Sequence, residues 1–103
     1  MAQFIIATNN AGVDKRNAIT NFVKSKQWGF WHHFEDFWMI TTNEPDQTTS
    51  QQIYEELTAK PEIGKEIFII VIRMAKTGHP MTHFGFGPPQ GWEWTSKYWG
   101  VVG

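Results

Sequence analysis

The sequence contains no cysteine, which excludes disulfide bonds, thiolate catalysis and metal sites built on thiolates. It also lacks an excess of charge of either sign, with nine Lys and Arg, ten Asp and Glu, and a net charge of −1. Strong general binding to nucleic acid depends on clustered cations, so this balance argues against it. No apolar run approaches the length of a membrane span, and residues 4–7 are too short and lack the basic start of a signal peptide. We therefore expect a cytoplasmic protein that does not bind membranes.

Aromatic residues are more frequent in this chain than in an ordinary protein. They make up 16% of its 103 residues and include six tryptophans. Apolar residues account for 41% and charged residues for 18%, which is the composition of a folded protein. Because each large ring buries much area, even a small core can hold such a fold together.

The first strand and helix follow from local patterns. Residues 3–8 form a short β-branched run that ends at the turn-forming cluster 9–12, as a buried strand does. Asn10 or Asp14 then caps a helix that extends to about Lys26. The apolar stripe of this helix is formed by Ala18, Ile19, Phe22 and Val23.

The aromatic stretch WGFWHHFEDFWMITT, residues 28–42, predicts a β-hairpin. Its only sharply polar pair, Glu35 and Asp36, separates two aromatic runs. We therefore expect strands at 28–34 and 37–42 joined by a tight turn.

Thr48 or Thr49 begins a second helix, since a glutamine three residues later completes a capping box. The strongly apolar residues 67–72 predict the last strand of the core. The resulting order βαββαβ is the ferredoxin-like plan, an α+β fold with a four-stranded antiparallel sheet and two helices on one face. We expect one domain over residues 1–103, with its core in 1–73.

A C-terminal extension, residues 74–103, has a different composition. Gly and Pro dominate 85–91, while 92–94 and 98–102 are aromatic and β-prone. We expect an additional short strand or an ordered flap there.

Both faces of the predicted sheet are apolar, although the two helices cover only one of them. In the hairpin, Phe30 and Phe34 are expected on one side, and Trp31 and His33 on the other; the sequence leaves open which side meets the helices. Because monomers rarely expose so large an apolar patch, we predict a homodimer with its sheets face to face and the aromatic extension at the seam. The aromatic or imidazole side chains expected on this sheet face or at the interface are Trp31, His33, Trp38, Trp92, Trp94 and Trp99.

The run WHHFEDFWMI, residues 31–40, resembles the WHxL-turn-xWIV signature of SinR-like proteins. These are small ferredoxin-like relatives of the CRISPR-associated adaptation nucleases of the type-two Cas family. The resemblance covers about residues 3–73, because the first strand, the first helix and the run 66–73 also fall at corresponding places. It implies a dimer of ferredoxin-like subunits but no particular activity, since SinR-like proteins are themselves of unsettled function.

The nuclease relatives carry an acidic residue at the end of the first strand, where paired subunits hold a divalent metal. Thr8, Asn9 and Asn10 stand there in this chain, and neutral amides are poor Mg2+ ligands. The nearest acid along the chain is Asp14. We therefore expect no cofactor, and a Mg2+-dependent nuclease is the alternative.

The histidines give only weak metal candidates. His32 and His33 are neighbours in a strand, so they point to opposite faces and cannot share one ion. His79 and His83 are four apart, but Pro80 forbids the helix that zinc ligands at this spacing use.

A polar corner remains as a possible contact surface. Asn9, Asn10, Lys15 and Arg16 gather where the first strand meets the first helix, and backbone amides at a helix start favour anions. The function we predict is a non-catalytic homodimeric module that binds another protein or serves as an adaptor in nucleic-acid defence. The alternatives are the nuclease and a small-ligand sensor at the dimer seam.

Overall fold

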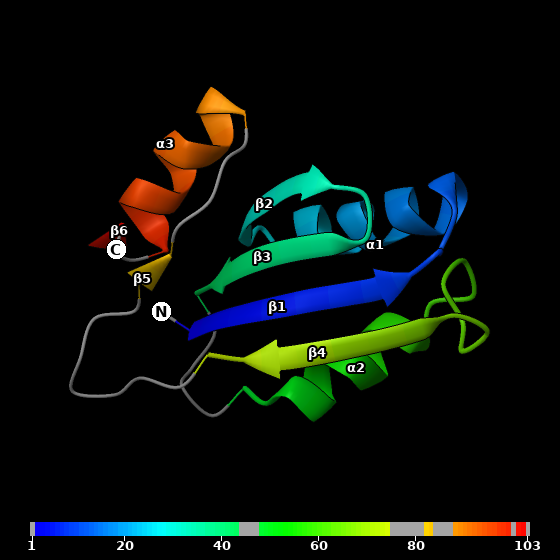
Figure 1. Cartoon of the computed structure of the whole chain (residues 1–103). Coiled ribbons are helices and arrows are strands. Elements are labelled where there is room, and N and C mark those ends of the chain that lie inside the picture. The colour runs from blue at the N-terminus through cyan, green and yellow to red at the C-terminus, as the bar shows by residue number, and fades with distance from the viewer. Residues whose placement is uncertain (1, 44–47, 75–81, 84–87, 100, 103) are drawn as a thin grey trace.

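The computed structural model describes residues 2–43, 48–74, 82–83, 88–99 and 101–102. The elements are β1 (Ala2–Asn9), α1 (Val13–Ser25), β2 (Gly29–Phe34), β3 (Phe37–Thr42), α2 (Ser50–Thr58), β4 (Phe68–Arg73), β5 (Thr82–His83), α3 (Pro89–Tyr98) and β6 (Val101–Val102). Among the described residues, β1 to β4 form one antiparallel sheet in the order β2-β3-β1-β4 (Figure 1). This order confirms the predicted ferredoxin-like arrangement.

Two helices cover one face of this sheet, as expected. In Figure 1, α1 and α2 both lie behind the four strands. Between these layers lies a core of fully buried side chains that come from both helices and from β1 and β3, among them Phe4, Ile6, Ile19, Val23, Trp38, Ile40, Ile53 and Leu57. Each such side chain contributes about 1.5–3 kcal/mol to folding, so this layer holds the fold together.

The N-termini of α1 and α2 are capped differently. Thr49 caps α2, where its side chain accepts from the Gln52 amide and the Gln52 side chain accepts from the Thr49 amide. This confirms the predicted capping box. The expected cap of α1 by Asn10 or Asp14 is wrong, because Gly12 occupies that position with no side-chain cap. Its φ of 87° is one that glycine adopts without strain.

A β-bulge in β2 changes which side chains share a face. Trp31 pairs with Met39, yet Phe34 pairs with Phe37, so the register shifts by one residue between them. Phe34 therefore lies on the same face as Trp31, where their rings are 4.9 Å apart. Phe30 instead packs against the core beneath the helices. The expectation that Phe30 and Phe34 share a face is therefore wrong, and the bulge is the reason.

The C-terminal extension, for which the sequence predicted a short strand or an ordered flap, contains a helix as well as the short strand β6. Residues 92–94 belong to α3, which begins with Pro89 at its first position, where the missing N–H is no loss. β5 and β6 pair with each other in parallel as a separate small sheet, so in the described residues the extension adds no strand to the main sheet. α3 stands beside the β2–β3 end of that sheet (Figure 1).

Candidate functional site

The face of the sheet turned away from α1 and α2 is the candidate site, and we call its uncovered part the open face. Strand pairing arranges it in rows. Ile5 of β1 lies opposite Ile72 of β4, and one step along the strands Ala7 lies between Phe37 of β3 and Ile70 of β4. The open face consists of Ile5, Ala7, Phe34, Phe37, Phe68, Ile70 and Ile72.

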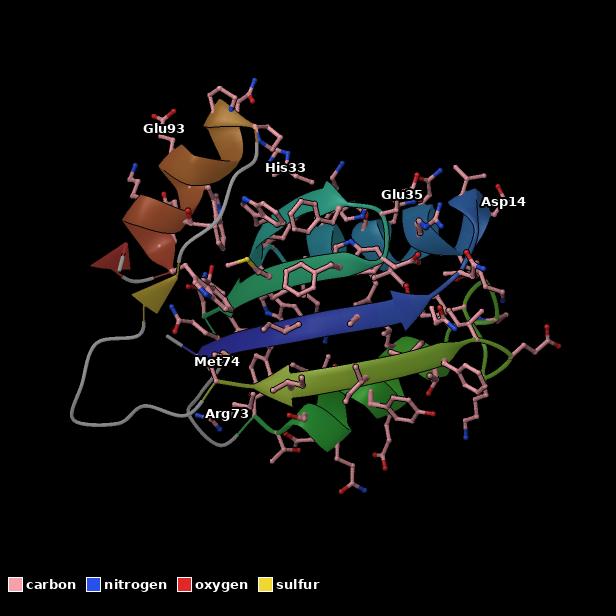
Figure 2. The ribbon with its side chains drawn as sticks, viewed as in Figure 1. Asp14, His33, Glu35, Arg73, Met74 and Glu93 are labelled. Atoms are coloured by element: carbon pink, nitrogen blue, oxygen red, sulfur yellow. The ribbon has the colours of Figure 1, made fainter. Side chains whose placement is uncertain are left out.

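Large apolar side chains on this face are accessible to solvent. Phe68 is 80% exposed, Ile70 55%, Phe34 51% and Ile72 42%. None of the seven residues of the open face carries a charge. In Figure 2 these strands present their side chains toward the viewer, and no described helix lies in front of β1 or β4. A charged group buried against such a surface would lose its hydration without gaining a partner.

α3 covers the neighbouring part of the same sheet face. Trp31 and Met39 from the sheet are buried together with Trp99, and Trp94 packs against this cluster. Gly91 permits the contact, because a β-carbon there would overlap the indole nitrogen of Trp31 and lie 3.0 Å from the ring of His33. α3 therefore covers part of the second sheet face within a single chain.

A hollow of about 230 Å3 lies on the open face, where β1 ends and β4 begins. It is lined by Ala7, Thr8, Asn9, Phe68, Ile69 and Ile70. The small side chain of Ala7 between the larger Phe37 and Ile70 leaves this space. Nothing in the local sequence pattern marks it, because it depends on the pairing of strands far apart in the chain.

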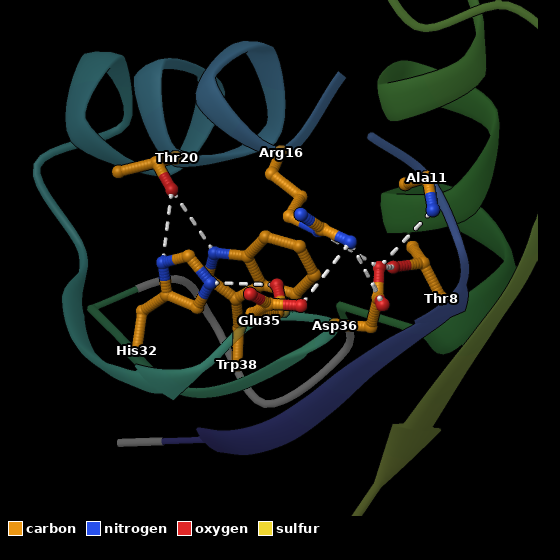
Figure 3. Close-up of polar contacts among 8 residues, drawn as sticks. All are labelled: Thr8, Ala11, Arg16, Thr20, His32, Glu35, Asp36 and Trp38. Carbon is orange, nitrogen blue, oxygen red and sulfur yellow. Dashed lines mark hydrogen bonds and ion pairs between the residues drawn. The ribbon is translucent and has the colours of Figure 1, made fainter. Parts of the chain in front are cut away.

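The polar corner where β1 meets α1 is organised around Asp36, in the turn between β2 and β3 (Figure 3). Asp36 Oδ1 accepts from Thr8 Oγ1 at 2.6 Å, from the Ala11 amide at 3.2 Å and from Arg16 Nε at 3.2 Å. Arg16 also donates to Oδ2 and lies 3.6 Å from Glu35. The hydrogen bonds from Arg16 and Thr8 lower the pKa of Asp36 to about 2.

The four residues predicted as an anion-binding surface are not brought together. Asn9 and Asn10 are exposed, but Arg16 turns toward Asp36 and Glu35. Lys15 donates instead to the carbonyl of Ile63, at 2.7 Å. Both cations therefore have partners within the chain, and the corner has no concentrated positive charge to offer a phosphate.

Trp38, which the sequence predicted on a sheet face or at the dimer interface, lies on the sheet face that α1 and α2 cover. Its ring is fully buried on the side of α1 and stacks on His32, with centroids 4.3 Å apart. Its Nε1 donates to Thr20 Oγ1 at 3.1 Å, and His32 Nδ1 lies 3.4 Å from the same hydroxyl (Figure 3). His32 Nε2 lies 2.9 Å from the carbonyl of Glu35, so both ring nitrogens of this histidine have partners within the chain.

The remaining metal candidates are dispersed. Asp14 lies in the first turn of α1 (Figure 2). Within the described part of the chain, no three His, Asp or Glu side chains are grouped closely enough to hold a metal ion. His79 and the side chains of His83 and Trp92 lie outside what the structure describes.

The described helices are all too short or too polar to cross a membrane. No protein-family model, curated protein or solved structure matches the chain.

Proposed function

We propose that this chain is a non-catalytic binding module of the SinR-like group, and that it works as a homodimer whose two subunits meet through the open face. The observation that carries the proposal is the exposure of Phe34, Phe68, Ile70 and Ile72 on one charge-free sheet face. Exposure of this kind on a folded chain marks a surface that another apolar surface covers.

The area of the open face supports a dimer. Large aromatic and aliphatic side chains at these exposures present roughly 400 Å2 of apolar surface, within the range where such patches are functional. With the partly exposed Ile5, Ala7 and Phe37, a symmetric pair would bury about 1,000 Å2 in total, the lower bound for a specific interface. An added contribution from α3 at the rim would bring it into the usual range.

The chemistry of the open face favours a second copy over the other predicted partners. Nucleic acid requires cations, and the open face has none. A second copy presents an equally apolar surface at equal concentration, and a two-fold axis makes every favourable contact twice. The dimer then offers its outer surfaces, including the exposed Asn10, to a further protein.

The corner at the end of β1 supports the non-catalytic part of the proposal. The structure brings two carboxylates to this place, and both face Arg16: Asp36 accepts two hydrogen bonds from it, and the exposed Glu35 lies 3.6 Å from it. A divalent metal would have to displace that guanidinium and the hydroxyl of Thr8. An acid neutralised in this way is a poor ligand for a hard cation.

Sedimentation equilibrium of three proteins tests the proposal. Wild type is expected to self-associate to twice the 11.9 kDa chain mass at micromolar concentration. Ile70→Asp places a charge on the open face, opposite Ala7, and is expected to abolish association. Asn21→Asp makes an exposed change on α1 and should leave it intact. A wild type that stays monomeric up to millimolar concentration rejects the proposal.

A further inference from the structure

We infer that Phe68 of each subunit inserts into the hollow beside Ala7 on the other subunit, and that this reciprocal contact is the energetic centre of the interface. The inference rests on the proposed dimer. It adds which side chain anchors the contact and which site receives it.

Phe68 has the position of an anchor. It begins β4, an edge strand of the sheet, and it is the most exposed large apolar side chain in the described part of the chain. Its ring is 80% exposed and pairs across the strands only with Asn9. A phenyl ring in this position forms few contacts within its own subunit, so its apolar surface becomes buried only through a partner.

The hollow has the size and chemistry of a receptor for that ring. The hollow is a depression of about 230 Å3 that is open to solvent, so it has room for a phenyl ring, since an enclosed cavity of about 150 Å3 holds benzene. Ala7 and Ile70 give it an apolar floor and wall, while Thr8 and Asn9 stand at the β1 end. A ring that enters it would contact methyl groups and displace water from them.

The adjacency of ring and hollow makes the contact reciprocal. Phe68 itself forms one wall of the hollow, so donor and receptor lie side by side on the same subunit. A two-fold axis that passes between them places each ring over the hollow of the other subunit, as an isologous interface requires. No other exposed ring on the open face has this arrangement in the described residues, since Phe34 lies on the opposite edge strand beside Phe37 and Trp31.

The test compares dimer dissociation constants of single variants. Phe68→Ala is expected to weaken the dimer roughly 30-fold or more, as removal of a central aromatic anchor does. Phe34→Ala is the matched control, an equal truncation on the same face at the other edge strand, and its effect should be less than about fivefold. Both side chains are half or more exposed, so neither truncation opens the core of the subunit.

A second variant tests the receptor without touching the ring. Ala7→Leu fills the hollow from its floor, on the open face, and leaves the helix-side core unchanged. We expect it to weaken the dimer about tenfold although it adds apolar surface. Circular dichroism of each variant verifies that its fold is retained.

The outcomes separate this inference from the proposed function. If wild type dimerises and Ile70→Asp disrupts it, but Phe68→Ala and Ala7→Leu bind as wild type does, the open face is the interface and the reciprocal anchor is wrong. If Ala7→Leu tightens the dimer, the hollow receives no ring. A monomeric wild type removes the dimer itself, and with it both statements.

Discussion

The indole nitrogen of Trp38 donates to the hydroxyl of Thr20, 3.1 Å away, and this bond fixes the largest buried side chain of the core to α1. Because an indole N–H only donates, the Thr20 hydroxyl accepts from it and remains free to donate to His32 Nδ1. The Nε2–H of His32 then donates to the carbonyl of Glu35. A single threonine thus connects helix, strand and hairpin turn (Figure 3).

Thr20→Val removes this hydroxyl at nearly constant volume. It leaves the buried N–H of Trp38 without an acceptor, and we expect a loss of about 1–3 kcal/mol in the free energy of unfolding. Urea denaturation measures it, with Thr20→Ser as the control that retains the hydroxyl. Equal stability of the valine and serine variants would show that the bond contributes nothing.

Asp36 makes stability depend on pH at the acid end. Its pKa falls from an ordinary 3.8 to about 2 in the folded chain, chiefly through the hydrogen bonds from Arg16 and Thr8. A lowered folded-state pKa gives stability that is fully present above about pH 4 and is lost as pH falls toward 2. Asp36→Asn should therefore lower stability by about 1–2 kcal/mol at neutral pH and flatten its pH dependence between pH 4 and 2.

Glu35→Gln is the matched control for that change. Glu35 is the other acid of the turn, but its side chain is 81% exposed and lies 3.6 Å from Arg16. Exposed pairs of this kind contribute little, so we expect less than about 0.5 kcal/mol. Unfolding curves at several pH values distinguish the two acids, and identical curves for both variants would contradict the described network.

Gly91→Ala tests how α3 is held on the sheet. In a helix, alanine is normally more stable than glycine by about 1 kcal/mol. Here the new β-carbon would overlap the indole nitrogen of Trp31, so α3 must move away from β2. Hydrogen exchange should show faster exchange in α3 and unchanged protection in β1 and β3. Gln90→Ala, an exposed change one residue earlier, should not speed exchange, and slower exchange in both variants would contradict the contact.

Divalent metal should leave the protein unaffected. Arg16 already faces both carboxylates of the hairpin turn, with two hydrogen bonds to Asp36 and an ion pair to Glu35. We expect Mg2+ or Mn2+ to leave the melting temperature unchanged within about 1 °C, since a ligand that does not bind the native state cannot stabilise it. Labelled RNA and DNA should remain intact at micromolar protein. Metal-dependent cleavage that Asp14→Ala abolishes would establish the nuclease alternative instead.

The sequence was sufficient for the core fold because its patterns there are local. The capping box at Thr49 and the polar pair Glu35–Asp36 both specify structure within a few residues. The unbroken apolar run 67–72 likewise predicted a strand with apolar side chains on both faces, and β4 has them. In each case short-range chemistry and tertiary packing favour the same conformation.

The open face required long-range information. After the bulge between Trp31 and Phe34, the side chains of β2 point to the opposite faces from those that simple alternation predicts. No turn-forming residue in the sequence marks this position. The hollow at Ala7 exists only because β1 pairs with both β3 and β4. The side chain of Asp36 meets Thr8 and Arg16 for a similar reason, since the three residues lie in different elements.

The extension shows how tertiary packing overrides propensity. Trp94 has strand propensity, yet it lies in α3 and packs on the Trp31 cluster. Gly91 is unfavourable in an isolated helix but is required by the close approach of α3 to Trp31. The helical conformation lets the aromatic side chains of the extension pack against the sheet. A short stretch of sequence reports only the local propensity and not this packing.

The most direct test of the central claim is an isotope-filtered NOE experiment on an equal mixture of 13C-labelled and unlabelled chains. The account predicts intermolecular NOEs among the methyl groups of Ile5, Ile70 and Ile72, which lie together on the open face. Intermolecular NOEs that arise only from α1 or α2, or none at millimolar concentration, would contradict it.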